Sequence, residues 1–492
     1  MSFFKAYDMR GTFGVDFDLD TVCKVGKALP KVIQDANGAR AANPADARSP
    51  AGESPMFSRP RILVGRDCRV TSASVRDALV RGLTEAGAEV TDLGLCTTPM
   101  VYFFTAEDGY DGSVMITASH NPPTDNGLKV SMRGALPVGY ANGLGEVERI
   151  VGADAGRVTE DGAARTRDAR RATDALARYV AWQIRRSGNQ AIRQLRYAVD
   201  CSNGMASLLV HEVFPDAVVI NDTLDGTFPN HSPNPLKAEA REQIAALVRE
   251  KGLDCGVIFD GDADRCMFVD EKGDFVQPDY LIPVVAKAML GVAKDKSPET
   301  EDGRLASQVS RPRIIHDVRT SRGAVEELRR MGCAPLMVPV GHAFAKPALR
   351  ESGAVCGGEL AGHYYFRDFH CCDSGVLAAT CILGEIAKAK SEGRTFSEMM
   401  KPISGVYANS GEMNFKVADK DAAIVRVLAA AKERLPQELS RSEIDGIRIE
   451  YDEGWINIRK SNTEPYLRLI VECDTSARLQ DWVGILADAL GV

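Results

Sequence analysis

An alternation of apolar, strand-like segments with amphipathic helical segments limits most strongly what this chain can fold into. The alternation runs three times, and strand-like residues at 61–65, 197–200 and 313–315 open the three rounds. Within the first round, residues 72–87 have a helical pattern and residues 89–95 again have the pattern of a strand. Repeated alternation of this kind predicts parallel sheets that are covered by helices.

The C-terminal part of the chain has a different pattern. A long helical segment at 420–435 is followed by strand-like residues at 446–451 and 455–458, which is an α+β arrangement. We therefore predict three similar α/β domains with mixed, mostly parallel sheets, followed by one α+β domain. The 492 residues are enough for four domains of ordinary size. Their predicted bounds are 1–155, 156–274, 275–395 and 396–492.

The composition is that of a soluble globular protein, with 45% hydrophobic and 26% charged residues. The net charge of -8 argues against nucleic acid as the main partner, although it leaves room for a local basic cleft that binds a small anion. No run of about 18 apolar residues and no secretory signal is present, so we expect no membrane partner. The 12 cysteines include no C-x-x-C pair, which is typical of reduced thiols, and we expect a cytoplasmic protein.

Two segments interrupt the alternation of strands and helices. Residues 37–60 are rich in Ala, Pro, Ser and Arg and show no period, and residues 294–312 are polar and charged. We interpret both segments as inserted surface loops, and we assign a function to neither.

A polar loop with the sequence Thr-Ala-Ser-His-Asn-Pro-Pro follows the strand-like residues 113–116. Ser119 and His120 are adjacent in this loop, Pro122 stiffens it, and Lys129 follows shortly after it. A serine that is held on a rigid loop at the end of a strand can act as a nucleophile or as a phosphate carrier. An ordinary turn rich in Ser, Asn and Pro gives the same pattern, so this loop alone does not decide between the two.

A cluster of carboxylates follows the strand-like residues 256–259. Asp260, Asp262 and Asp264 stand at alternate positions, and Arg265 follows them. Clustered carboxylates repel one another, but three of them at the end of an apolar strand can converge on one hard cation. An EF-hand is excluded because Arg265 stands at the sixth position, where Gly is required. A phosphatase that uses Asp260 as its nucleophile stays open.

Two further loops have groups that suit a sugar phosphate. Residues 459–463 (Arg-Lys-Ser-Asn-Thr) combine a guanidinium, two hydroxyls and an amide in one turn, which suits a phosphate group. Residues 357–363 place Glu359 and His363 on a Gly-rich loop, and both side chains can hydrogen-bond sugar hydroxyls. Each signal is weak alone, because polar turns are common.

Taken together and in this order, the loops resemble the motifs of the α-D-phosphohexomutase family, of the phosphomannomutase/phosphoglucomutase type. The resemblance covers nearly the whole chain and includes the opening Tyr-Asp-Met-Arg-Gly of residues 7–11. It implies that the four domains surround a central cleft and that Ser119 carries a phosphoryl group. It also implies that Mg²⁺ is bound by Ser119 and the three aspartates of the acidic loop, Asp260, Asp262 and Asp264. Hexose 1,6-bisphosphate is the implied intermediate and activator.

The resemblance implies roles for further residues by their position in the motifs. Arg10, His120 and Lys129 are the implied catalytic residues around the transferred phosphoryl group, and Lys129 is our candidate for the base. The implied substrate contacts are Tyr7, Arg265, Arg319, His342, Glu359, Ala361, His363, Arg459, Ser461, Asn462 and Thr463. Ala361 stands where many relatives have Ser, and Arg319 stands where Lys is common, so both positions bear on the sugar preference.

The implied substrate is a hexose phosphate with mannose or glucose as the sugar. The loop that follows Gly358 is similar to that of phosphomannomutases and of dual phosphomannomutase/phosphoglucomutases, whereas phosphoglucosamine mutases usually carry Ser-Gly-Thr at residues 461–463. We therefore predict an isomerase that interconverts hexose 1-phosphate and hexose 6-phosphate, as a monomer or a homodimer. A phosphoglucosamine mutase, a phosphatase and a non-catalytic sugar-phosphate-binding paralogue stay open as alternatives.

Overall fold

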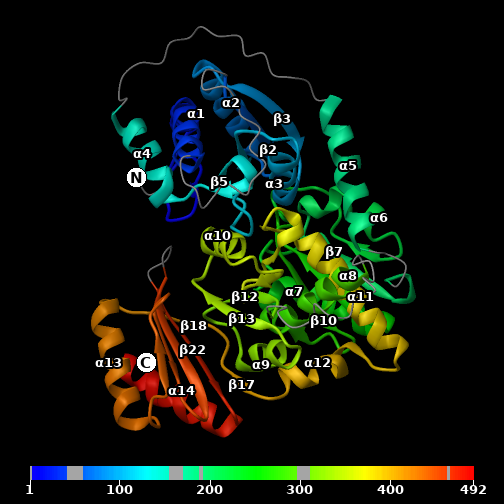
Figure 1. Cartoon of the computed structure of the whole chain (residues 1–492), viewed down its shortest axis with the longest axis vertical. Helices are drawn as coiled ribbons and strands as arrows, with labels where there is room; N and C mark the ends of the chain where they lie inside the picture. Colours follow the sequence, from blue (N-terminus) through cyan, green and yellow to red (C-terminus); the bar gives the residue numbers. More distant parts are fainter. Residues whose placement is uncertain are drawn as a thin grey trace, which may run out of the picture. The chain divides into compact units, whose positions relative to one another are not determined.

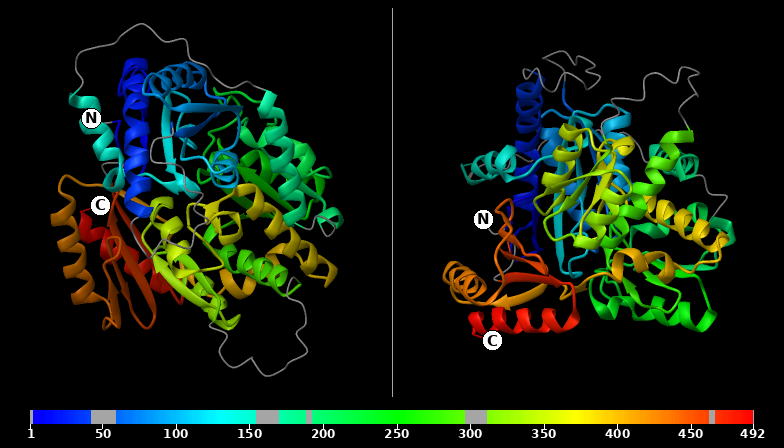
Figure 2. Two further views of the ribbon diagram at one scale, coloured as in Figure 1. Left: turned by 45° about the horizontal axis from the view of Figure 1, so that its top comes forward. Right: turned by 60° about the horizontal axis from the view of Figure 1, so that its bottom comes forward.

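Four groups of strands form the framework of the chain in its computed structural model (Figures 1 and 2). The structure describes residues 3–41, 59–153, 170–187, 192–295, 311–461 and 466–491. The contacts between residues divide the chain into two units. The first unit comprises Met1–Val276 and Ala361–Phe396, and the second comprises Gln277–Leu360 and Ser397–Val492.

The first sheet lies in the first unit and combines parallel and antiparallel pairs. Its strands are β1 (Met9–Thr12), β2 (Arg61–Arg66), β3 (Glu89–Leu95), β4 (Gly112–Ile116), β5 (Asp125–Met132) and β6 (Leu136–Pro137). Its helices are α1 (Leu19–Ala41), α2 (Ser72–Glu85), α3 (Thr98–Glu107) and α4 (Leu144–Ala153). The strand order is β1-β5-β4-β2-β3, with β6 beside β5. The pairs of β2 with β3 and β4 are parallel, whereas β5 pairs antiparallel with β4 and β1.

The core of the first sheet forms on the face that α1 and α2 cover. Ile62 and Val64 are two residues apart on β2, so both point to this face, where they pack with Leu79 of α2. The two helices lie together in Figure 1. A β-carbon on Gly82 would come within 2.1 Å of the Cys23 carbonyl oxygen, so the helices can cross this closely only with a glycine at position 82.

The second sheet repeats the arrangement of the first. Its strands are β7 (Tyr197–Asp200), β8 (Val218–Ile220), β9 (Cys255–Phe259), β10 (Cys266–Asp270) and β11 (Phe275–Val276), and its order is β11-β10-β9-β7-β8. The helices of this region are α5 (Arg170–Ser187), α6 (Val210–Val213) and α7 (Ala238–Lys251). As in the first sheet, three neighbouring strands are parallel and the next two are antiparallel. The first unit also contains the antiparallel pair β15 (Tyr364–Phe366) and β16 (Cys372–Asp373), followed by α11 (Gly375–Ser391).

The second unit opens with a parallel α/β segment. Its strands β12 (Arg313–Asp317), β13 (Ala334–Val338) and β14 (Cys356–Gly358) have the parallel order β13-β12-β14. The helices of this part are α8 (Ile282–Asp295), α9 (Arg322–Arg330) and α10 (His342–Ser352), and α12 (Phe396–Ser404) follows later in the chain.

The C-terminal sheet of the second unit is antiparallel. Its strands are β17 (Ala408–Asn409), β18 (Met413–Lys416), β19 (Ser440–Ser442), β20 (Ile447–Glu450), β21 (Gly454–Lys460) and β22 (Tyr466–Cys473). Two helices, α13 (Lys420–Arg434) and α14 (Ser476–Leu490), lie against this sheet in Figure 2. Val427 of α13 and Leu486 of α14 share one apolar core with Ile456 of β21, so both helices cover the same face.

The predicted fold class is confirmed, with mixed sheets and helices in three α/β regions and an α+β C-terminal region. The predicted loop at 37–60 is wrong at its start, because α1 continues to Ala41. The remainder of that segment, 42–58, and residues 296–310 of the second predicted loop lie outside the described residues. All 12 cysteines are described and free, as expected for reduced thiols. Among the described helices, none combines the length and apolar character that a membrane crossing requires.

Candidate active site

Ser119 lies on the loop that leaves β4, in a backbone conformation that few serines adopt. Its φ is +50° and its side chain is buried. A residue other than glycine in this left-handed region is strained, and such strain concentrates at functional sites. The Ser119 Oγ donates a hydrogen bond to Asp260 Oδ2 at 2.8 Å and lies 3.2 Å from His120 Nδ1. The hydroxyl is therefore fixed between a carboxylate and an imidazole.

A buried arginine, Arg69, holds the backbone of the Ser119 loop. A guanidinium has five N–H donors, and all five have acceptors here. The Nε of Arg69 donates to Asp67 at 3.1 Å. The two Nη atoms donate to the carbonyl oxygens of Ser119 (2.9 Å), Asn121 (2.7 Å), Pro122 (2.6 Å) and Asp125 (2.9 Å). Arg69, with a hydrogen-bond acceptor for each of its five N–H groups, thus stabilises the strained conformation of the loop.

The three predicted metal ligands converge after β9. One oxygen each of Asp260, Asp262 and Asp264 lies within 4.8 Å of the others, and all three side chains are buried. The Lys129 ammonium, from β5, lies 2.7 Å from Asp262 Oδ2 and 2.5 Å from Asp264 Oδ2. Thr98, the first residue of α3, also donates to Asp262 Oδ2 at 2.5 Å. Lys129 is more than 130 residues away from this cluster in the sequence, and the fold brings them into contact.

The charges of the cluster act on one another. Burial, together with the charges of Asp264 and Asp262, raises the pKa of Asp260 well above its usual range. Burial also favours protonation of Asp264, but Lys129, His363 and Arg265 together outweigh it and hold the pKa of Asp264 below its usual range. In return, the two carboxylates raise the pKa of Lys129 although burial lowers it. Lys129 is therefore a cation that offsets the carboxylates.

The donor set of this cluster fits a divalent cation. Oxygen atoms are the ligands that Mg²⁺ prefers, and two of them, Asp262 Oδ1 and Asp264 Oδ1, are buried with no hydrogen-bond partner among the described residues. A buried carboxylate oxygen without a donor is costly unless a cation or a solvent molecule faces it. The acidic loop can therefore hold a metal ion.

Two more of the predicted catalytic residues lie beside Ser119. Arg10, on β1, is held by Asp8 at 2.6 Å and donates to Asn121 Oδ1 at 3.2 Å. Burial opposes the charge of Arg10, but the carboxylates of Asp8 and of the acidic loop outweigh it and raise its pKa. Burial lowers the pKa of His120 well below its usual range, and the charges of Arg265 and Arg10 lower it further. The imidazole of His120 is therefore neutral.

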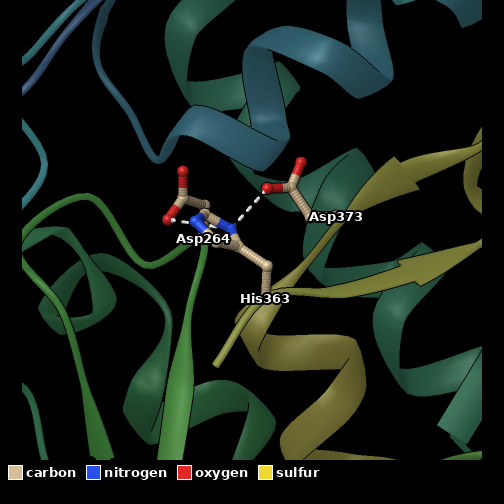
Figure 3. A group of neighbouring side chains, drawn as sticks. All are labelled: Asp264, His363 and Asp373. Carbon is tan, nitrogen blue, oxygen red and sulfur yellow. Dashed lines mark hydrogen bonds and ion pairs between the residues drawn. The ribbon is translucent and has the colours of Figure 1, made fainter. Parts of the chain in front are cut away.

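His363 lies between Asp264 and Asp373 (Figure 3). Its Nε2 accepts a hydrogen bond from Arg265 Nε at 2.9 Å, so the ring proton sits on Nδ1 and is donated to Asp373 Oδ2 at 2.7 Å. Both ring nitrogens of His363 are thus occupied by protein groups. Arg265 Nε also lies 3.7 Å from Asp260 Oδ2, the carboxylate oxygen that accepts the hydrogen bond from the Ser119 hydroxyl.

In the second unit, the predicted substrate contacts gather around arginines. Arg319, which follows β12, donates to Asp317 Oδ2 through Nε (3.0 Å) and Nη2 (2.6 Å). Its Nη2 lies 3.8 Å from the Glu359 carboxylate. Arg459, on β21, and Arg319 both contact Glu412, at 2.7 and 3.4 Å. All of these side chains except Glu412 are buried at the level of a few per cent exposure. The structure thus brings Arg319, Glu359 and Arg459 into one cluster.

The remaining predicted contacts are Ser461, His342, Tyr7, Ala361, Asn462 and Thr463. Ser461 is buried beyond the end of β21, and its backbone N–H donates to the Tyr466 carbonyl oxygen at 2.9 Å. His342 begins α10 and is half-buried, as are Tyr7 before β1 and Ala361 in the first unit. Asn462 and Thr463 lie outside the described residues.

The structure adds four residues that the sequence motifs did not predict: Arg69, Thr98, Asp373 and Glu412. Arg69, Thr98 and Glu412 each act on a predicted residue that is far away in the chain, and none of the four lies inside a motif. Asp373 lies 10 residues after its partner His363. Arg69 comes shortly after the strand predicted at 61–65, and a charged residue near a strand end is the one signal that could have pointed to it. The other three had no comparable signal.

Comparison with known proteins gives one consistent result over the whole chain. Residues 1–152, 174–273 and 277–405 match the alpha/beta/alpha domains I, II and III of phosphoglucomutase/phosphomannomutase, and residues 412–489 match its C-terminal domain. The chain belongs to the phosphoglucomutase/phosphomannomutase family. It is accordingly an isomerase, a phosphohexomutase, as the resemblance of its motifs implied.

Two curated relatives match at nearly full length. A phosphomannomutase of Salmonella montevideo is 33% identical over 478 residues, which is 95% of this chain and 94% of the relative. Proteins of Xanthomonas campestris pv. campestris named phosphohexose mutases are 34% identical over 480 residues, 97% of this chain and 96% of theirs.

Solved structures agree with this result. A phosphoglucomutase/phosphomannomutase family protein of Burkholderia thailandensis is 27% identical, with a TM-score of 0.76, and covers 99% of this chain and 97% of its own. The N-acetylphosphoglucosamine mutase of Aspergillus fumigatus, solved with GlcNAc-6P and magnesium, has a TM-score of 0.59 over 99% of this chain and 95% of its own. Its 14% identity shows the shared fold alone.

Proposed function

We propose that this phosphohexomutase interconverts the 1-phosphate and the 6-phosphate of mannose, glucose or both, with Ser119 as the residue that carries the transferred phosphoryl group. The observation that carries the proposal is the placement of Ser119. Its buried hydroxyl is held 2.8 Å from a carboxylate of the acidic loop, on a strained loop that one arginine fixes. A nucleophile that is positioned in this way gains from a fixed orientation toward its partner.

In the first half of the cycle, the phosphoryl group leaves Ser119 Oγ for O6 of a hexose 1-phosphate. The bond between phosphorus and Oγ breaks as the bond to O6 forms. O6 gives up its proton to a basic group. Lys129 is our candidate for this base, and it accepts the proton only after its own ammonium proton has passed to one of the carboxylates that it contacts. The base then releases this proton and Ser119 Oγ takes up one in exchange, so protons balance over this half of the cycle.

In the second half, the hexose 1,6-bisphosphate presents its other end to Ser119. The bond between phosphorus and O1 breaks, a bond to Oγ forms again, and O1 takes the proton that Oγ loses. The product is hexose 6-phosphate. Arg10 and Arg265 both interact with carboxylates of the acidic loop, and their charges oppose the negative charge of the phosphoryl group in both halves.

Mg²⁺, when bound by Asp260, Asp262, Asp264 and an oxygen of the phosphoserine, supplies positive charge against the leaving oxygen. The chain's own contribution is to hold Asp262 and Asp264 together through Lys129, with Thr98 bound to Asp262. The Lys129 ammonium lies between Asp262 and Asp264, and we propose that it takes part in catalysis next to the metal site.

The phosphate that stays on the sugar binds, in this proposal, to Arg459, Ser461, Asn462 and Thr463. Glu359 and Arg319 contact the sugar hydroxyls, and His342, Tyr7 and Ala361 complete the predicted set. For His363 the contacts support a different task. Both of its ring nitrogens have protein partners, so we propose that it orients Arg265.

The predicted domain bounds of 1–155, 156–274, 275–395 and 396–492, with a loop of the site in each, are part of the proposal. The four sheets and the four matched domain ranges support these bounds. Cytoplasmic placement, a monomeric or homodimeric state and activation by hexose 1,6-bisphosphate belong to the proposal as well.

A ³¹P NMR time course tests the substrate. The protein, Mg²⁺ and a trace of hexose 1,6-bisphosphate are mixed with mannose 1-phosphate, glucose 1-phosphate or N-acetylglucosamine 1-phosphate in separate tubes. We expect a 6-phosphate signal to grow without free phosphate for mannose or glucose, and the two rates give the preference. Turnover of the amino sugar alone would contradict the substrate, and release of free phosphate would favour a phosphatase.

A further inference from the structure

Glu412 binds three arginines through one carboxylate. Its Oε1 accepts from Arg459 Nη2 at 2.7 Å and from Arg319 Nη1 at 3.4 Å, and its Oε2 accepts from Arg468 Nη1 at 3.2 Å. The residue directly precedes β18, whereas Arg319 follows β12 and Arg459 lies on β21. One side chain therefore joins the α/β part and the antiparallel part of the second unit.

The Glu412 carboxylate is ionised at neutral pH. Burial works against the carboxylate, but Arg319, Arg459 and Arg468 outweigh it and lower the pKa of Glu412 to about 2. Glu412 is therefore an anion at any physiological pH, and each contact that it makes is a charge-assisted hydrogen bond.

The backbone around Glu412 leaves little freedom for the side chain to swing away. Gly411 N–H donates to Asn409 Oδ1 at 2.8 Å, and Gly411 has a φ of +66° that closes a tight turn. Ser410 is bonded to Val471 of β22 in both directions, at 2.9 and 3.0 Å. The turn is thus fastened to the sheet, and the arginines orient around an anchored carboxylate.

Arg459 retains a free edge while it is held. Its Nη2 binds Glu412, but its buried Nε has no hydrogen-bond partner among the described residues. A buried guanidinium N–H that lacks a partner is costly, and phosphate is the group that guanidinium forks bind with two parallel hydrogen bonds. The contact with Glu412 leaves the Nε N–H available for such a group.

We propose that Glu412 is a positioning residue for the phosphate group that stays on the sugar, because it fixes Arg459, the arginine assigned to that phosphate, and holds Arg319 beside it. The inference rests on the proposed function, in which these two arginines contact the substrate. Glu412 itself does not touch the substrate. In the alternative, Glu412 occupies the place of the phosphate and is displaced when the substrate binds. Removal of its charge would then increase the affinity for the substrate, whereas a positioning role predicts a decrease.

Glu412→Gln tests the inference, because it removes the charge and keeps the size. Kd for hexose 6-phosphate is measured by titration calorimetry, and kcat and KM are measured for the mannose and glucose substrates. We expect Kd and KM to rise about tenfold for both sugars, the scale found when a partner that orients a binding residue is lost, with kcat changed much less. Glu438→Gln is the matched control, since Glu438 pairs at 2.8 Å with the exposed Arg441 in the same unit.

Three results would overturn the inference. An unchanged Kd removes the positioning role, and a lower Kd favours displacement of Glu412 by the phosphate. A rise in KM for one sugar only would contradict a role at the shared phosphate. Glu412→Asp keeps the charge but shortens the reach, so an intermediate Kd is expected, and this variant serves if the Gln variant does not fold. Failure of the wild-type protein to bind any hexose phosphate overturns the proposed function, whereas equal binding by wild type and variant overturns the inference alone.

Discussion

The two units each contain a cluster of like charges that is held by one opposite charge, and the signs are reversed. In the first unit, three carboxylates converge and the Lys129 ammonium lies between two of them, at 2.7 and 2.5 Å. In the second unit, three arginines converge and the Glu412 carboxylate lies between them, at 2.7 to 3.4 Å. The first cluster suits a divalent cation and the second suits a phosphate anion.

In each cluster, one opposite charge from another element of the fold holds the like charges together. A group of like charges repels itself, and a single opposite charge on a neighbouring element relieves the repulsion and fixes the side chains. The pKa shifts follow this pattern, because the carboxylates raise the pKa of Lys129 and the arginines lower the pKa of Glu412 to about 2. The clusters differ in their backbone support. The Ser119 loop beside the carboxylates is strained and bound by Arg69, whereas the arginines lie on or next to regular strands.

The largest expected effect is that of Ser119→Ala, which removes the phosphoryl carrier beside the carboxylate cluster. We expect kcat to fall by about 10³-fold or more, the scale seen when a nucleophile is removed. The arginine cluster is untouched, so Kd for hexose 6-phosphate measured by calorimetry stays close to the wild-type value. Activity near the wild-type rate would show that Ser119 carries no phosphoryl group.

Asp262→Asn is expected to have the next largest effect. The change removes one charge from the cluster and one ligand from the predicted metal site, so we expect kcat to fall about 100-fold and the Mg²⁺ concentration for half-maximal activity to rise. Assays over a range of Mg²⁺ concentrations measure both. Asp222→Asn, at an exposed carboxylate that pairs with His211, is the control. An unchanged Mg²⁺ dependence in Asp262→Asn would show that Asp262 does not bind the metal ion.

Arg69→Lys tests whether backbone support matters for the first cluster. An ammonium has three donors in place of the five that Arg69 uses, so it cannot bind all four loop carbonyl oxygens. We expect kcat to fall about tenfold, because the Ser119 hydroxyl loses its fixed orientation. Arg76→Lys is the control, since Arg76 is partly exposed and pairs with Asp92. Equal activity in the two variants would show that the loop holds its conformation without Arg69.

Asp279→Asn has the smallest expected effect and sharpens the contrast within the second unit. Asp279 is buried without an arginine, and burial raises its pKa to about 7, opposite to the shift of Glu412. Above pH ~4 the unfolded chain has lost the Asp279 proton, whereas the folded protein keeps it until the pH approaches about 7. Protonated Asp279 therefore contributes fully to stability below pH ~4, and this contribution is lost as pH rises through about 7. Between pH 6 and 8 the wild-type protein should lose about 1 kcal/mol of stability that the variant keeps. Urea unfolding of both proteins at the two pH values measures this, and parallel pH dependences would refute it.

Local patterns predicted most of the fold. The strands predicted at 61–65, 89–95 and 197–200 correspond to β2 (Arg61–Arg66), β3 (Glu89–Leu95) and β7 (Tyr197–Asp200), because apolar runs between polar turns are a local signal. The same dependence on apolar runs explains why the C-terminal end of α1 was not predicted. Residues 37–41 (Asn-Gly-Ala-Arg-Ala) have no apolar period, and the helix continues there without one.

The candidate site was predicted in part. Ser119, Asp260 and Arg459 stand in motifs at strand ends, and position in the sequence was enough to single them out. Their supporting residues were not predictable, because the contacts of Arg69 with the Ser119 loop, of Thr98 with Asp262, and of Glu412 with Arg459 exist only in the folded chain. The occupied ring nitrogens of His363 belong to the same group, since the sequence shows a histidine but not its partners.

The most direct test of the central claim is to find where the phosphoryl group resides during turnover. The protein is incubated with hexose 1,6-bisphosphate and Mg²⁺, its phosphorylated peptide is identified by mass spectrometry, and the phosphoenzyme is then mixed with mannose 1-phosphate or glucose 1-phosphate. We predict phosphate on Ser119 alone, and its transfer to the sugar without release of free phosphate. Phosphate on Asp260, removable by hydroxylamine, or phosphate lost only to water, would contradict the account.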